Sequence, residues 1–135
     1  LWKHGGVEPV SIASGITGWI QSTAFSPDGV YYAIASHDGS LSFWNAADGS
    51  EFGRVIDSRM GPGRIEFSPD SRTLIGWNRS HVRFWNVATQ REIMRIDLDN
   101  VSSRGSVAND FSISPDGRFM AFDRSTGDTE IWQAP

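Results

Sequence analysis

Short stretches in which hydrophobic residues alternate with small or polar ones recur along the chain, separated by turns rich in Gly, Asp and Ser. Alternation with a period of two is typical of half-buried β-strands. Helical hydrophobic spacing with capping residues appears nowhere. The pattern predicts strands over residues 19–25, 30–36, 41–44, 51–56, 63–67, 73–77, 81–86, 91–96, 109–113, 118–122 and 128–133. The predicted fold class is therefore all-β.

One turn motif appears three times, as Ser26-Pro27-Asp28-Gly29, Ser68-Pro69-Asp70-Ser71 and Ser114-Pro115-Asp116-Gly117. In such a turn, proline presets φ at the first corner, and the aspartate side chain bonds back to the backbone. The last residue accepts a left-handed conformation, which suits glycine. Because Ser71 stands where the other two copies have glycine, we expect a left-handed backbone at Ser71.

A second landmark keeps step with these turns. Trp2, Trp44, Trp85 and Trp132 each follow a hydrophobic residue, at intervals of 42, 41 and 47 residues, and the turn prolines are 42 and 46 residues apart. Each period holds the signals for four short strands. Four-stranded units repeating every 40 to 45 residues or so are typical of β-propeller blades.

Residues 15–55 closely resemble a WD-repeat (WD40) blade, and the resemblance extends over essentially the whole chain. It implies a partial β-propeller of four-stranded antiparallel blades, two of them complete and two partial. Residues 1–12 would end a preceding blade, 13–56 and 57–97 would each form a blade, and 98–135 would form a blade that lacks its outer strand.

The resemblance also implies a buried hydrogen-bonded tetrad of His, Ser or Thr, Asp and Trp in each blade. Ser36, Asp38 and Trp44 match three of its positions, while Ile16 stands where the His is expected. In the later blades, only Trp85 and Trp132 match. We therefore expect Ser36, Asp38, Trp44, Trp85 and Trp132 to have structural roles.

Three blades cannot surround a central channel, because a closed ring needs about four or more. Two outcomes remain open. The residues are a segment of a longer propeller, which we favour because an open array exposes strand edges. Alternatively, copies associate through their open blade edges, and a symmetric pair would give six blades.

Candidate partner-binding residues lie at one end of the predicted blades. Trp19 and Trp77 do not occupy the periodic Trp position, and aromatic and Arg side chains dominate binding hot spots. The extra length of the third period falls in the loop around 97–106, which is also a candidate. The set is Trp19, His37, Trp77, Arg79, His81, Arg104 and Arg124. An equally weighted alternative packs both indoles between blades.

Composition narrows the function. The 135 residues carry 12 basic and 16 acidic side chains, a net charge of −4, and no cysteine. This excludes disulfides and thiol chemistry and argues against nucleic-acid binding. No apolar run approaches the roughly 18 residues of a membrane span. The Asp38-Gly39 turn accounts for His37-Asp38 without a metal.

No nucleophile elbow or phosphate-binding loop is present, so we expect no enzyme, cofactor or metal. The predicted function is a scaffold for a protein or peptide partner. The alternatives are an accessory propeller domain of a larger enzyme or regulator, and a self-assembling ring.

Overall fold

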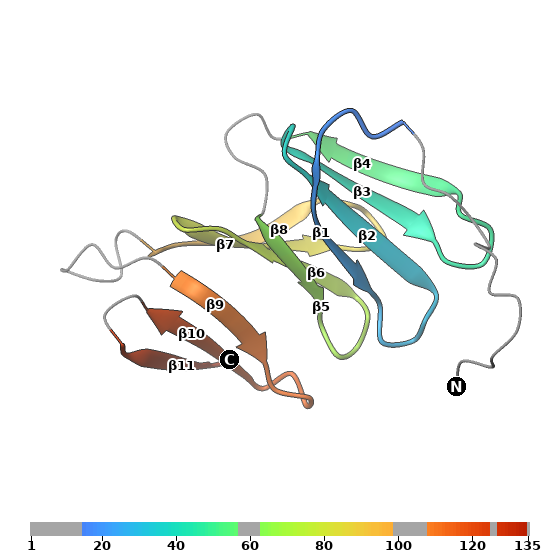
Figure 1. Cartoon of the computed structure of the whole chain (residues 1–135). Coiled ribbons are helices and arrows are strands. Elements are labelled where there is room, and N and C mark those ends of the chain that lie inside the picture. The colour runs from blue at the N-terminus through green and yellow to red at the C-terminus, as the bar shows by residue number, and fades with distance from the viewer. Residues whose placement is uncertain (1–14, 57–62, 99–107, 125–126, 135) are drawn as a thin grey trace, which may run out of the picture.

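The structure, a computed structural model, describes residues 15–56, 63–98, 108–124 and 127–134. Among these residues, it contains three antiparallel β-sheets (Figure 1). The first sheet comprises β1 (Ile20–Phe25), β2 (Tyr31–Ser36), β3 (Ser40–Asn45) and β4 (Glu51–Ile56). The second comprises β5 (Arg64–Phe67), β6 (Thr73–Trp77), β7 (His81–Asn86) and β8 (Glu92–Asp97). The third comprises β9 (Ala108–Ile113), β10 (Phe119–Arg124) and β11 (Thr129–Gln133).

Within each sheet the strands pair in the order in which they occur in the chain. Every predicted strand is confirmed, with ends that shift by at most two residues, and the predicted all-β fold of propeller-like blades is confirmed with them. The sheets follow one another in space, and β1 lies against β5 (Figure 1). An ion pair between Arg64 on β5 and Asp110 on β9, with 3.4 Å between Nη1 and Oδ1, connects the second sheet to the third.

The repeated turn has the same hydrogen bonds in all three sheets. The serine hydroxyl donates to the Asp carboxylate two residues later and accepts the backbone N–H of the residue five positions on. The expected left-handed backbone at Ser71 is confirmed, since its φ is +62°, close to +74° at Gly29 and +71° at Gly117. Identical local chemistry therefore makes the same turn even where serine replaces glycine.

The hydrophobic core consists of two clusters, one between each pair of neighbouring sheets. The cluster between the first and second sheets joins Ala33, Ala35, Leu41 and Phe43 to Ile65, Phe67, Leu74, Trp85 and Val87. The cluster between the second and third joins Ile75, Trp77, Val82, Phe84 and Leu98 to Phe111 and Phe122, with Trp132 packed against it. Trp85 and Trp132 thus each face the preceding sheet.

Trp44 also points away from the sheet that follows its own. Successive side chains of a strand point to opposite faces, and Phe43 packs toward the second sheet. The Trp44 side chain therefore lies on the far face of the first sheet, where it is buried and stacks on Tyr32 with 5.9 Å between ring centroids. All three repeated tryptophans within the described residues are packed rather than presented.

Candidate interaction surface

Trp19 lies at the end of the first sheet where the chain enters β1, and its side chain is 86% exposed. Its backbone is nevertheless held in place. The Trp19 carbonyl accepts hydrogen bonds from the His37 N–H at 2.8 Å and from the Ser36 hydroxyl at 3.4 Å. The His37 ring, also exposed, lies 6.5 Å from the indole between centroids. A large apolar side chain is therefore presented to solvent from a fixed backbone.

Close packing beneath Trp19 depends on Gly18. A Cβ atom at this position would lie 2.4 Å from the Ser36 hydroxyl and 2.8 Å from the Asp38 nitrogen, distances that real Cβ atoms essentially never show. The segment that leads into β1 consequently lies directly on the turn between β2 and β3. Any side chain at residue 18 would push it outward and move Trp19.

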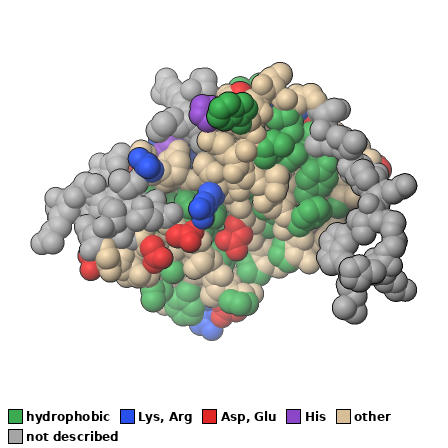
Figure 2. Space-filling view, in the orientation of Figure 1, with side chains coloured by type: hydrophobic (Ala, Val, Ile, Leu, Met, Phe, Trp, Pro, Cys, Tyr) green, Lys and Arg blue, Asp and Glu red, His purple; other side chains and the backbone are tan. Residues whose placement is uncertain are grey.

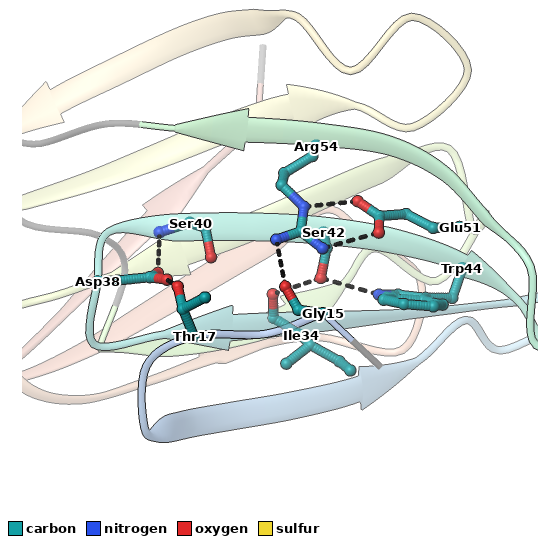
Figure 3. Close-up of polar contacts among 9 residues, drawn as sticks. All are labelled: Gly15, Thr17, Ile34, Asp38, Ser40, Ser42, Trp44, Glu51 and Arg54. Carbon is teal, nitrogen blue, oxygen red and sulfur yellow. Dashed lines mark hydrogen bonds and ion pairs between the residues drawn. The ribbon is translucent and has the colours of Figure 1, made fainter. Parts of the chain in front are cut away.

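Asp38 connects the same two segments from the side (Figure 3). Its carboxylate accepts the Ser40 N–H at 2.9 Å and the Thr17 hydroxyl at 2.8 Å. The hydrogen bonds from Ser40, followed by that from Thr17, hold the pKa of Asp38 well below its ordinary value of 3.8. The carboxylate therefore remains charged at neutral pH and continues to accept these bonds.

The tetrad implied by the family resemblance is not formed as expected. The Trp44 indole N–H donates to the Ser42 hydroxyl at 2.8 Å, two residues earlier on the same strand (Figure 3). Ser36 is buried but bonds to Trp19, and Asp38 is exposed rather than buried. With Ile16 at the histidine position, Thr17 donates to Asp38 instead.

The position two residues before each repeated tryptophan carries a polar side chain that was not among the predicted site residues. It holds Ser42, Arg83 and Glu130 in the three sheets. Ser42 accepts the indole N–H of Trp44, and Glu130 accepts that of Trp132 at 3.2 Å. Arg83 is buried and lies 3.8 Å from the Glu92 carboxylate. The signal was a polar residue in phase with the tryptophan, but three different side chains concealed it.

At the same end of the second sheet, two of the predicted contact residues are buried. Trp77 is only 6% exposed and packs against Phe111 with 4.8 Å between ring centroids, so it belongs to the core and not to a contact surface. His81 is also buried, with its Nε2 3.1 Å from the Asn78 amide nitrogen. Both predictions of a contact role are wrong for the same reason: these side chains point between sheets.

Arg79 remains exposed on the turn between Trp77 and His81. The long loop around 97–106, with Arg104, and the side chain of Arg124 lie outside the described residues. Of the seven predicted contact residues, the structure thus leaves Trp19, His37 and Arg79 exposed, and it brings Trp19 and His37 together.

Charged side chains of both signs lie on the first strands of the second and third sheets, β5 and β9. Figure 2 shows carboxylates gathered around a basic side chain near the middle of this face. Arg64 pairs with Asp110, and the pKa of Glu66 is raised by burial and by the negative charge of Asp110. Charges of both signs therefore lie close together on this edge in the part of the chain that the structure describes.

The four described stretches contain neither a metal-binding cluster nor a membrane-spanning helix. There, no three His, Cys, Asp or Glu side chains converge in a way that could hold a metal ion. The same residues include no helix with the length and apolar character that crossing a bilayer requires.

Two curated WD40-repeat proteins of Schizosaccharomyces pombe are similar to the chain. The small ribosomal subunit protein RACK1 is 24% identical over 123 residues, which cover 88% of this chain and 39% of that protein. The periodic tryptophan protein 2 homolog is 42% identical over 57 residues, which cover 42% of this chain and 6% of that protein. No protein-family model matches the chain. The relatives support a WD40 relationship at low identity, and the chain spans well under half the length of either.

Proposed function

We propose that this chain is a non-catalytic scaffold of WD40-like blades that binds a protein partner through the end of the first sheet that carries Trp19 and His37. The observation that carries the proposal is the 86% exposure of Trp19 on a backbone fixed by hydrogen bonds from Ser36 and His37. An exposed indole on a backbone that is already fixed offers a partner a large apolar area, and only its two side-chain torsions have to be ordered on binding.

The similarity to WD40-repeat scaffold proteins supports this function at the general level. The surroundings of Trp19 favour a partner over a substrate. His37 and Asp38 are exposed at a tight turn, and the hydrogen bonds to Asp38 come from Ser40 and Thr17 of the same turn region. Within the described residues, no hydrogen bond joins the Asp38 carboxylate to a second titratable side chain. The mechanism is presentation of fixed groups to a partner surface.

The proposal is tested by comparing Trp19→Ala with Ile93→Ala, which removes another exposed hydrophobic side chain, 58% exposed, from β8 in the second sheet. A bound partner is first identified by cross-linking to the wild-type chain, purified, and measured by calorimetry against all three proteins. We expect Trp19→Ala to weaken binding by about 30-fold or more, the effect of a hot-spot residue worth about 2 kcal/mol.

Ile93→Ala is expected to bind like the wild type. Both variants should unfold at the wild-type denaturant concentration, because neither side chain is packed. A partner that binds Trp19→Ala as tightly as the wild type would refute the proposed surface.

A further inference from the structure

The two contacts between neighbouring sheets are built from the same repeat positions. The residue before the repeated tryptophan faces the following sheet, and Phe43 and Phe84 at this position are both buried. The residue before the serine of the repeated turn faces the preceding sheet, where Phe67 is buried and Ile113 packs against the core. At each contact, the earlier sheet therefore contributes the residue before its repeated tryptophan, and the later sheet contributes the residue before its turn serine.

In the third sheet, the residue before the repeated tryptophan has no following sheet to pack against among the described residues. Ile131 precedes Trp132, as Phe43 precedes Trp44, yet Ile131 is 71% exposed. Phe119 on β10 and Ala121, which pairs with Ile131 across the strands, line a shallow apolar depression on the same face. This surface is the counterpart of one that is buried in both other sheets.

In the first sheet, the residue before the turn serine is not covered by a preceding sheet among the described residues. Phe25 precedes Ser26, as Phe67 precedes Ser68, yet Phe25 is 68% exposed where Phe67 is 4% exposed. Tyr32 lies beside it, with 5.5 Å between ring centroids. Trp44, farther along this face, is already buried, so the open part is the half that lies near the repeated turn.

Both open halves lie at the turn end of their sheets, and the turns already contact one another across both existing interfaces. The Asp28 N–H donates to the Ser71 hydroxyl at 3.1 Å across the first interface. A Cβ at Gly117 would lie 3.8 Å from Pro69 across the second. The next contact in this series would place Pro115 and Asp116 of the third sheet against a turn such as that around Gly29.

We infer that the open face of the third sheet binds the open face of the first sheet in a second copy of this chain. The occupant is identified by the repeat itself, because among the described residues the surface that covers Phe43 and Phe84 has one further counterpart, on the first sheet. Such head-to-tail contacts either close into a ring or continue into a filament. With the three sheets that the structure describes in each, two copies supply six sheets, within the four to eight blades of known propellers, whereas three copies supply nine.

The inference is independent of the Trp19 surface, and it is tested with the 135-residue chain by sedimentation velocity over a wide range of concentration. We expect a dimer of twice the 14.9 kDa chain mass. Ile131→Lys and Phe25→Lys each place a charge in both contacts of the dimer and should give monomers. Ile93→Lys adds the same charge at an isoleucine elsewhere that is 58% exposed, and this variant should remain dimeric.

The decisive measurement mixes the two monomeric variants. Ile131→Lys retains the wild-type Phe25 face, and Phe25→Lys retains the wild-type Ile131 face, so one intact contact can form between them. A one-to-one mixture should therefore yield a dimer, weaker than the wild type, although neither variant dimerises alone. Near-UV circular dichroism confirms that both variants are folded, which their exposure predicts.

A wild-type chain that is monomeric at every concentration would overturn the inference and leave these faces to other partners or to further repeats. So would a polydisperse aggregate, or a mixture of the two variants that remains monomeric.

Discussion

Trp19 and Trp77 lie at the same end of neighbouring sheets, and neither occupies the repeated tryptophan position. One side chain is exposed and the other is buried. The Trp19 side chain is in solvent beside His37, whereas the Trp77 side chain packs on Phe111 of the third sheet. Trp19 belongs to the segment that precedes β1, outside the ladder, and Trp77 ends β6, whose alternate side chains face the next sheet.

The turns beside the two tryptophans are also held by different contacts. In the first sheet, Gly18 and Asp38 hold the entering segment against the turn from outside. In the second, the Asn78 side chain accepts the backbone N–H groups of Ser80 and His81, so the turn is closed from within. The comparison shows that residue type alone does not decide whether an indole is presented or packed. Its place relative to the ladder does.

The largest expected effect comes from removing the packed indole. Trp77→Ala should lower the free energy of unfolding by about 3–5 kcal/mol, as large-to-small changes in a core do, and Trp85→Ala should cost the same. Trp19→Ala should change it by no more than about 0.5 kcal/mol. Urea denaturation of the three variants measures this. Equal losses for Trp19→Ala and Trp77→Ala would remove the distinction between the two regions.

The second effect tests how tightly the Trp19 segment is held. Gly18→Ala forces a Cβ against Ser36 and Asp38 and should cost about 1–3 kcal/mol, the usual range for overpacking. Gly63→Ala is the matched control, because its Cβ would lie 3.5 Å from the Trp77 carbonyl oxygen, an ordinary contact. Denaturant midpoints that fall equally for the two variants would show that residue 18 is not closely packed.

A third prediction concerns pH. Hydrogen bonds from Ser40 and Thr17 lower the pKa of Asp38, and the turn serines lower the pKa values of Asp28, Asp70 and Asp116. A lowered carboxyl pKa stabilises the fold above the unfolded value of 3.8, and this contribution is lost as the pH falls through the lowered pKa. Stability should therefore be level above about pH 5 and should decrease in acid.

The Asp38→Asn variant distinguishes the contribution of Asp38 to this pH dependence from that of the aspartates in the repeated turns. The wild type should be more stable than Asp38→Asn at pH 7, and the difference should shrink toward pH 3 and below as Asp38 of the wild type becomes protonated. Urea midpoints measured across this pH range give the difference directly. A difference that grows in acid would contradict the assignment of Asp38 as a charged acceptor.

The smallest effect tests the one turn that lacks glycine. Ser71→Gly relieves a left-handed residue, worth up to about 1 kcal/mol, but loses the hydrogen bond from Asp28, worth about the same. We expect a net change near zero. Ser71→Ala loses the bond and keeps the strain, so it should be less stable than Ser71→Gly by about 1 kcal/mol. Thermal unfolding that ranks the two variants the other way would refute this account.

Much of this architecture could be predicted from local pattern. The strand positions, the three turns and the left-handed Ser71 follow from alternation, from the Ser-Pro-Asp motif and from repeat phase, all of which act over a few residues. The candidate surface was predicted less well. Trp19 and His37 are exposed as expected, but Trp77 and His81 are buried, because their exposure depends on which sheet packs beside them.

The partner of each polar group also lay beyond sequence reasoning. Trp44 bonds to Ser42 rather than to the Ser36 and Asp38 tetrad, since the indole N–H reaches its own strand first and the expected histidine is Ile16. What the chain alone determined is the repeating unit: its strands, turns and alternating faces. Only the stacking of three sheets decided which copies of a position are covered, because Phe43 and Phe84 have a following sheet and Ile131 has none among the described residues.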